Sequence, residues 1–321
     1  MNCKICKEDT SCLSINTYKH TWFFCKNCKN IYSKKKLNKD SKLKIFLVNL
    51  ISKITNQNRI KKLLLNSNIS DNEFYNYTSN FPSEGGSHFP IKDNINNKWE
   101  EYDKNFIEYL KEKKIDLNSK KILSISDEPG IIVKKLEKFT SIKKITLTGF
   151  DKETSRVMSK KLNCRVEKFD LNKDRLSNVI NDKYDLIFFR STLNFNLDFD
   201  LLLSEIKKVS NEDVSIIFNF HAPTTASCLM WMFDDYTLLS LINIDYLKPL
   251  IKKYNFKIIF SEKISLNPRK HYYNNFVKKL FYYPFYFFYL TQIFVKNLFN
   301  KDQVTIDSNE FSYKLILKRD I

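Results

Sequence analysis

The pattern of apolar and polar positions near the middle of the chain predicts a strand, a tight turn, a helix and a second strand. Positions 122–125 are apolar apart from one serine, Gly130 interrupts the run, and apolar residues then recur at helical spacing as far as Leu136. A second apolar run starts at Ile145 and closes on Asp151. This order forms one βαβ unit, and a carboxylate about 20 residues beyond the glycine turn lies where nucleotide-binding folds hold ribose hydroxyls.

The same alternation continues to residue 265 and predicts an α/β fold. The further elements expected are helices over 153–162, 201–209 and 246–254 and strands over 165–169, 184–189, 214–220 and 256–260. Single helices between strands indicate a parallel sheet with helices on both faces. Ligands of such sheets bind at the carboxyl ends of the strands. The candidate residues at these ends are Ser126, Glu128, Gly130, Asp151, Asp170, Arg190, Ser191 and His221.

Two pairs of cysteines near the amino terminus have the spacing of a metal site. Cys3 and Cys6 form one C-x2-C pair, Cys25 and Cys28 form the second, and 18 residues separate the pairs. This spacing is typical of structural zinc sites, in which four thiolates fill a tetrahedral coordination sphere. We therefore expect a small zinc-ribbon-like module whose ion supplies folding free energy and has no open position for a catalytic water.

Five stretches of the predicted sheet carry a resemblance to a known family. They are ILSISDEPG with its helix, TGFD, KFD, KYDLIFFRSTLNF and INIDYLKPLIKKYNFKI. With them, the chain resembles the class I S-adenosylmethionine-dependent methyltransferases over about residues 120–265. The resemblance implies a Rossmann-like sheet of six parallel strands and one antiparallel strand, with FSYKLILK at 311–318 as the final strand. The cysteine module is similar to the zinc-binding module fused to members that methylate sugars or other small metabolites.

The resemblance also assigns the strand-end residues to a cofactor site. Asp151 would bind the ribose hydroxyls of S-adenosylmethionine, because a carboxylate can accept two hydrogen bonds from a diol. Asp170 or its backbone would contact the adenine amine, and Gly130 would let the first helix start close to the amino acid portion. The family usually has an acidic residue and three glycines in its first motif. The first three of these positions are here Ser124, Ser126 and Glu128.

Two histidines are candidates for a catalytic base. Methyl transfer from a sulfonium needs an aligned acceptor and, where the acceptor carries a proton, a base to take it. His221 follows the fifth strand and is the first candidate. His88 is the second, because it follows Gly85 and Gly86 in the loop FPSEGGSHFP, which holds two of the four glycines. This loop is either a substrate loop or an ordinary surface loop.

Two further segments leave a choice between packing and membrane contact. Apolar residues recur at helical spacing from Leu43 to Ile54, with lysines at 42, 44 and 53. We favour a helix that covers a neighbouring domain over one that lies on an anionic membrane. The aromatic segment 276–299 poses the same choice, and we favour buried packing or contact between identical subunits over peripheral membrane association.

The net charge of +18 changes this picture little. Only seven of the 54 basic residues are arginines, and the lysines are scattered, so we expect solvated lysines and disfavour a nucleic-acid partner. No apolar segment follows Met1, and we expect a cytoplasmic protein or one peripheral to the inner face of the membrane. The expected domains are the module at 1–40, a connector at 41–119, the cofactor domain at 120–265 and an aromatic tail with the final strand at 266–321.

The predicted function is methyl transfer from S-adenosylmethionine to a small molecule, such as a sugar or a polysaccharide or lipid-linked precursor. The alternative is a non-catalytic binding or scaffold protein that keeps the fold, because the first motif departs from the family pattern. A nucleic-acid methyltransferase ranks third, since only the positive charge and the cysteine module support it.

Overall fold

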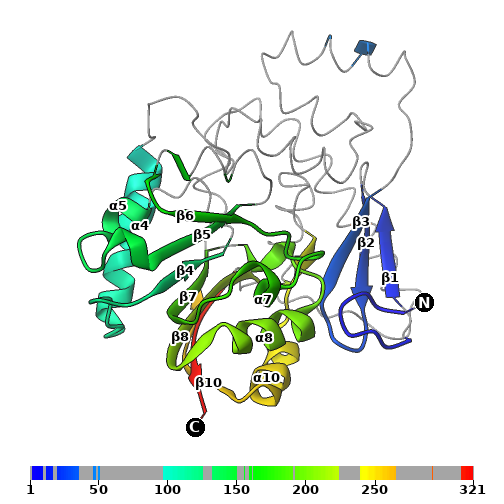
Figure 1. The fold of residues 1–321 in the computed structure, drawn as a ribbon. Coiled ribbons are helices and arrows are strands. Elements are labelled where there is room, and N and C mark those ends of the chain that lie inside the picture. The colour runs from blue at the N-terminus through cyan, green and yellow to red at the C-terminus, as the bar shows by residue number, and fades with distance from the viewer. Residues whose placement is uncertain are drawn as a thin grey trace. The chain divides into compact units, whose positions relative to one another are not determined.

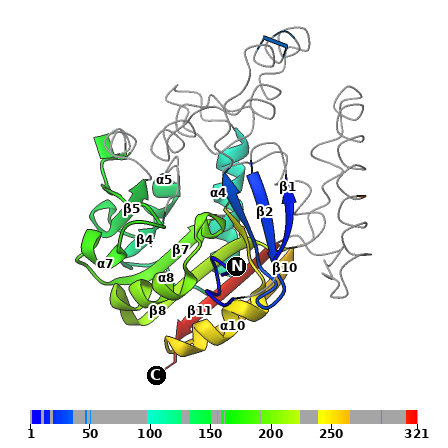
Figure 2. The ribbon, with the colours of Figure 1, turned by 90° about the vertical axis from the view of Figure 1, so that its right-hand side faces the viewer.

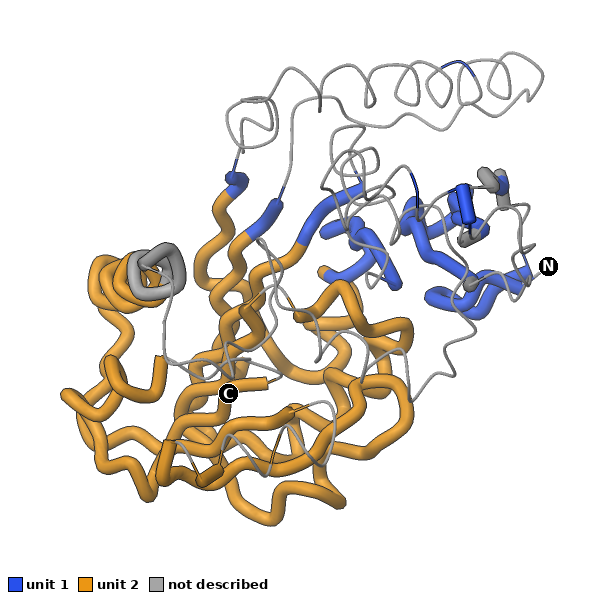
Figure 3. Tube along the Cα trace, turned by 90° about the horizontal axis from the view of Figure 1, so that it is seen from above, with its two compact units in different colours: residues 1–68, 221–247, 263–313 blue, residues 69–220, 248–262, 314–321 orange. Residues whose placement is uncertain are grey.

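The computed structural model of the chain describes residues 2–9, 12–16, 20–35, 46–47, 50, 97–125, 132–149, 155, 159–160, 162–190, 192–223, 239–264, 291 and 312–320. The chain divides into two compact units (Figure 3). The first unit contains 1–68, 221–247 and 263–313, and the second contains 69–220, 248–262 and 314–321. Each unit therefore combines segments that are distant in sequence, whereas the sequence analysis divides the chain into four consecutive ranges.

The larger sheet has seven strands in the order β10-β11-β8-β7-β4-β5-β6 (Figure 1). In chain order these are β4 (Ile122–Ser124), β5 (Ile145–Gly149), β6 (Arg165–Lys168), β7 (Tyr184–Arg190), β8 (Ser210–His221), β10 (Phe256–Ile264) and β11 (Ser312–Arg319). The strands from β4 to β8 pair in parallel. All residues of β4 and β5 are buried, as expected for parallel strands whose two faces are covered by helices.

The strand order reverses between β4 and β7. From β4 the chain continues outward through β5 and β6, and it then returns to the other side of β4 with β7 and β8. Ile122 is in register with Ile145 of β5 and with Leu186 of β7, so the carboxyl ends of the three strands reach the same edge. The final strand, β11, lies between β8 and β10. This seven-stranded mixed sheet confirms the predicted fold class.

Helices cover both faces of this sheet (Figure 2). The helices are α4 (Asn97–Glu112), α5 (Ile132–Leu136), α7 (Leu176–Val179), α8 (Phe199–Lys208) and α10 (Ile244–Lys253), with 3-10 turns η1 (Ile142–Lys144) and η2 (Leu193–Phe195). Phe106 and Leu110 of α4 and Leu136 of α5 share one core with Leu147 and Leu186 of the sheet. Helices α7 and α8 lie on the opposite face. The apolar residues of α4 and α5 therefore form one core with the sheet.

The smaller sheet is antiparallel and belongs to the first unit. Its order is β1 (Cys12–Asn16), β2 (His20–Cys25), β3 (Ile31–Lys35) and β9 (Ser240–Leu241). The rings of Phe23 and Tyr32 stack at 5.1 Å between centroids, and Trp22 is buried. The sequence analysis gives no strand at β9. Among the described residues, no helix is long and apolar enough to span a membrane.

Candidate functional site

The carboxyl ends of β4 and β7 are joined by two hydrogen bonds. The backbone N–H of Ile125 donates to the carbonyl of Phe188 at 3.0 Å. The hydroxyl of Thr192 donates to the carbonyl of Ile125 at 3.1 Å. These bonds fix the starts of the two loops that flank the point where the strand order reverses, which is where ligands of such sheets bind.

Asp170 lies directly beyond β6 and is buried, with 5% of its surface exposed. Its N–H donates to Oδ2 of Asp174 at 2.8 Å, and its Oδ1 accepts from the N–H of Asn172 at 2.9 Å. Its Oδ2 lies 3.7 Å from Nζ of Lys173. The carboxylate therefore retains capacity to accept a hydrogen bond from an amine. This geometry fits the adenine contact that the family resemblance implies for Asp170.

The loop that begins at Asp170 is tied to the loop that follows β7. The side-chain amide of Asn172 donates to the carbonyl of Phe195 at 2.6 Å, and its Oδ1 accepts from the N–H of Leu197 at 3.0 Å. One side chain thus links loops that come from the two sides of the reversal point, since β6 lies on the β5 side of β4. This link restrains both loops at the candidate cofactor edge.

Gly149 ends β5 and lies against a helical serine. A Cβ added to Gly149 would lie 2.6 Å from Oγ of Ser155 and 3.5 Å from its Cα. Only a residue without a side chain allows this close approach, as in the glycine that packs helix against strand in dinucleotide-binding folds. The glycine of the TGFD stretch is thus a packing requirement. Asp151, which closes that stretch, lies outside the described residues.

Arg190 ends β7 and forms a buried ion pair with Asp103 of α4. The two side chains are 3% and 1% exposed, and the guanidinium lies 5.4 Å from the ring centre of Phe106. We predicted that Arg190 contacts the cofactor. In the structure its charge faces Asp103, so the observed contact joins helix α4 to the end of a central strand.

The sequence analysis did not single out Asp103. It lies three residues before Phe106 and four before Ile107, both of which belong to the apolar core. A charged residue on the apolar face of an amphipathic helix is a sequence signal for a buried partner. The local sequence could have indicated that Asp103 has a buried partner. It could not have identified Arg190 as that partner, because Arg190 is 87 residues away in the chain.

His221, the first candidate for a base, is the last residue of β8 and is 8% exposed. Its carbonyl accepts a hydrogen bond from the N–H of Ile242 at 3.0 Å. The histidine thus lies at a strand end, where the sequence placed it. The other predicted site residues lie outside the described part of the chain: His88, Ser126, Glu128, Gly130, Asp151 and Ser191.

The four cysteines predicted as metal ligands meet at one point. Their sulfur atoms all lie within 4.8 Å of one another. The Cys3 and Cys28 sulfurs are 3.9 Å apart, and those of Cys6 and Cys25 are 3.8 Å apart. A tetrahedral zinc ion with bonds of about 2.3 Å to sulfur has sulfur atoms about 3.8 Å apart. The geometry therefore fits a zinc ion bound by four thiolates.

The two halves of this cluster have the same backbone conformation. The residue after each pair, Lys7 or Lys29, has a positive φ of 64° or 55°. Its N–H donates to the carbonyl of the first cysteine of its pair, at 2.9 Å to Cys3 and 3.0 Å to Cys25. Two equivalent turns that each direct two sulfur atoms inward are typical of a structural metal site.

The segment that follows β9 contacts both cysteine turns. The N–H of Asn243 donates to Oδ1 of Asn30 at 2.6 Å, and the hydroxyl of Tyr246 donates to the carbonyl of Ile5 at 3.1 Å. The carbonyl of Cys28 accepts from the side-chain amide of Asn243 at 3.4 Å. The cysteine module therefore packs on residues more than two hundred positions later in the chain.

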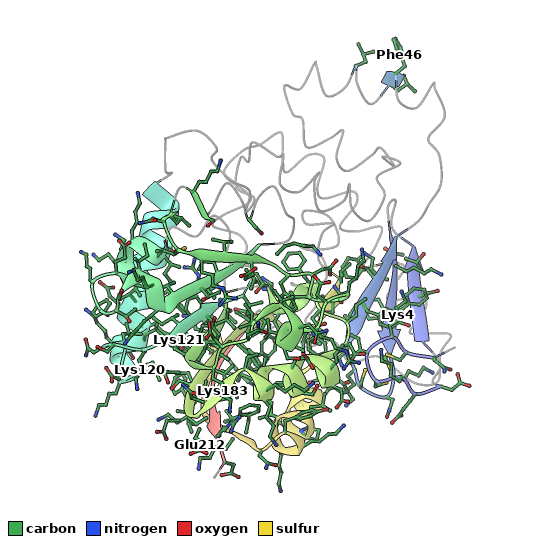
Figure 4. All side chains as sticks on the ribbon, viewed as in Figure 1. Lys4, Phe46, Lys120, Lys121, Lys183 and Glu212 are labelled. Atoms are coloured by element: carbon green, nitrogen blue, oxygen red, sulfur yellow. The ribbon has the colours of Figure 1, made fainter. Side chains whose placement is uncertain are left out.

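The charged residues at the amino ends of the strands pair with one another. Nζ of Lys121 lies 2.8 Å from Oδ1 of Asp182, and a guanidinium nitrogen of Arg165 lies 2.8 Å from Oδ2 of the same residue. The hydrogen bond from Lys121, aided by the charge of Arg165, lowers the pKa of Asp182. Figure 4 shows Lys120, Lys121 and Lys183 together at this edge of the sheet. Of the predicted cofactor residues, the two that the structure describes, Asp170 and Arg190, lie at the opposite ends of their strands. Lys120 and Lys121 form ion pairs with Asp116 and Asp182.

Comparisons with known proteins give structural similarities at low sequence identity. No protein-family model matches the sequence, and no curated protein matches it. In all, 731 chains of solved structures match. An S-adenosylmethionine-dependent methyltransferase from Clostridium acetobutylicum is 12% identical and covers 72% of this chain and 94% of its own, with a TM-score of 0.43. Magnesium protoporphyrin IX methyltransferase from Synechocystis is 10% identical. The match covers 78% of this chain and 100% of the methyltransferase, with a TM-score of 0.47.

The strand order, with its reversal between β4 and β7, defines an α/β protein whose ligand edge lies at the carboxyl ends of the strands. More narrowly, a seven-stranded mixed sheet with the last strand, β11, between β8 and β10 is typical of the S-adenosylmethionine-dependent methyltransferase fold.

Proposed function

We propose that this chain transfers a methyl group from S-adenosylmethionine to a small molecule. The observation that carries the proposal is the edge at the carboxyl ends of the strands. The strand order reverses there between β4 and β7, and Asn172 ties the loop that begins at the buried Asp170 to the loop after β7. Ligands of open α/β sheets bind at such an edge. The acceptor is proposed as a small molecule because of the resemblance of the cysteine module to that of sugar and metabolite methyltransferases.

The residues that would hold the cofactor are Asp170 at its adenine amine, Asp151 at its ribose hydroxyls and Gly130 beside its amino acid portion. When bound, S-adenosylmethionine supplies a methyl group whose bond to sulfur breaks as the acceptor's lone pair forms a new bond to carbon. The chain's contribution is to align the acceptor, exclude water and receive a proton where the acceptor carries one. His221 would accept that proton on its imidazole.

A transfer assay with methyl-labelled cofactor tests the proposal. The zinc-loaded chain is incubated with labelled S-adenosylmethionine and, separately, with a small-molecule extract, purified RNA or a protein extract of matched mass. We expect label to appear in the small-molecule fraction and to fall at least tenfold with Asp170→Ala, which removes the adenine contact. Label in RNA or protein alone would contradict the proposed acceptor class. With His221→Ala, an unchanged rate and pH profile would contradict the proposed base.

A binding protein without catalysis is the second candidate, and one described residue favours it. Ser124, fully buried at the end of β4, stands where the family usually has an acidic residue. A folded, zinc-loaded chain that binds no S-adenosylmethionine at millimolar concentration and transfers label to none of the three fractions would support this second function over the first.

A further inference from the structure

Three apolar residues in the segment 43–54 are exposed. Phe46, Leu47 and Leu50 are helical, and 62%, 46% and 44% of their surfaces are exposed (Phe46 is labelled in Figure 4). In a helix, residues at i, i+1 and i+4 lie on one face. The sequence analysis favoured a helix whose apolar face covers a neighbouring domain. The structure leaves these three apolar side chains exposed, so their surfaces are open to a partner.

The sequence around these residues concentrates positive charge. Between residues 34 and 62 the chain has ten basic residues and a single acidic one, Asp40. These 29 positions thus contribute half of the net charge of +18 of the 321-residue chain. The sequence analysis described the lysines as scattered, and this concentration corrects that description for positions 34–62.

We propose that the segment 43–54 is a peripheral membrane anchor that lies in the interface of an anionic lipid bilayer. Phe46, Leu47 and Leu50 would enter the boundary between headgroups and acyl chains, and the neighbouring lysines would contact the lipid phosphates. Helices with lysines beside a face of Phe and Leu bind such interfaces. The proposal is independent of the methyl-transfer activity, since it concerns where the protein acts and not what it does.

Charge decides between a bilayer and a second copy of the chain as the occupant of this face. A second copy would bring two strongly basic segments together, and like charges at short distance repel. An anionic bilayer offers the complementary charge as well as an apolar phase.

Vesicle flotation of the full-length, zinc-loaded chain tests the anchor. The probes are vesicles of phosphatidylcholine alone and vesicles in which roughly one third is phosphatidylglycerol. We expect flotation with the anionic vesicles, and at least about tenfold less with neutral ones or at high salt, because salt screens the attraction between lysines and phosphates. No binding to the anionic vesicles would overturn the proposal.

Variants assign the binding to this segment. Phe46→Asp with Leu50→Asp removes apolar surface and adds negative charge, and we expect it to abolish flotation while the circular dichroism spectrum stays unchanged. Ile259→Asp is the matched control, because Ile259 is 46% exposed, as Leu47 is, but lies on β10. It should float as the parent chain does. Full binding of the Phe46/Leu50 variant to the anionic vesicles would overturn the proposal and would assign lipid binding to another segment, such as 276–299. The proposal would also be overturned if the parent chain bound no lipid and the variant differed from it only by a loss of self-association.

Discussion

Asp103 and Arg190 place opposite charges where neither side chain has water around it. Removing a charge from water costs free energy that only a well-placed partner of opposite charge offsets. Replacing both residues of a buried pair with apolar residues therefore costs little stability, whereas replacing only one residue costs much. The pair also determines where α4 sits against the end of β7. A contact between one helix and one strand end thereby shapes the edge that we assign to the cofactor.

Breaking this pair from one side should destabilise the protein strongly. Asp103→Leu leaves Arg190 buried without an opposite charge, and we expect the free energy of unfolding to fall by about 3–5 kcal/mol. The double variant with Arg190→Met should regain most of that loss, because no charge is then left buried. Urea denaturation measures both effects. A double variant as unstable as the single variant would contradict the view that the unpaired buried charge causes the loss.

The close contact between Gly149 and Ser155 can be tested by adding a single methyl group. In Gly149→Ala the new methyl group would lie 2.6 Å from Oγ of Ser155, so we expect a loss of about 1–3 kcal/mol from overpacking. Adding Ser155→Ala removes the oxygen and should restore about half of the loss or more. Thermal denaturation of the two single variants and the double variant completes the cycle. Additive losses of stability in the two single variants would contradict a direct contact between residues 149 and 155.

At the scale of elements, α7 and α8 are joined by a buried acid. Glu205 of α8 is 2% exposed. It accepts hydrogen bonds from the N–H and the hydroxyl of Ser177 at 2.9 and 2.6 Å, and from Lys208 at 2.5 Å. Burial raises the pKa of Glu205, but the hydrogen bonds from Lys208 and Ser177 outweigh burial and lower it. The carboxylate therefore stabilises the folded state in its charged form.

This lowered pKa makes part of the stability dependent on pH. A carboxyl group with a lower pKa in the folded state stabilises it fully above the unfolded value, near 4.5, and this contribution is lost as the pH falls through the folded value. We expect Glu205→Gln to lower the free energy of unfolding by about 1–2 kcal/mol at pH 7 and to flatten its decline between about pH 5 and 3. Parallel stability curves for the two proteins would contradict this role.

The cysteine module is the second element-scale feature, and its stability should depend on zinc. We expect one zinc per chain by elemental analysis. Removal by a chelator should change the tryptophan fluorescence, to which Trp22 contributes from its buried position in β2, three residues before Cys25. Cys28→Ser should lose the metal. Cys164→Ser is the control, because Cys164 is a buried cysteine outside the cluster. A full zinc content in the Cys28 variant would contradict the assigned ligands.

Regular periodicity made most elements predictable, and long-range pairing made others unpredictable. The strand expected at 184–189 corresponds to β7 (Tyr184–Arg190), and the helix at 246–254 to α10 (Ile244–Lys253). The strand at 311–318, which the family resemblance implied, corresponds to β11 (Ser312–Arg319). Strand β9 has only two residues, and it exists because it pairs with β3 of the cysteine module. No local pattern contains that partner. The metal ligands, by contrast, were predictable because their spacing alone encodes two turns.

At the scale of the whole molecule, residues that are distant in sequence build both compact units. The cysteine module is completed by the segment 239–247, through β9, Asn243 and Tyr246. The described part of the candidate site comes from the loops that follow β4, β6 and β7. The place of Asp170 after a strand could be predicted from local sequence, and its contact with the cofactor stays a prediction. The ion pair of Arg190 depends on a residue 87 positions earlier, which sequence order does not reveal.

The central claim is that the carboxyl edge of the seven-stranded sheet binds S-adenosylmethionine, and calorimetric titration of the zinc-loaded chain tests it most directly. We predict one site per chain, weakened about tenfold or more by Asp170→Asn, because a hydrogen bond to a charged group contributes about 1.5–3 kcal/mol. Asp213→Asn is the matched control, since Asp213 is exposed at the amino end of β8, and it should bind as the parent chain does. No binding at millimolar S-adenosylmethionine by the folded, zinc-loaded chain would contradict the claim.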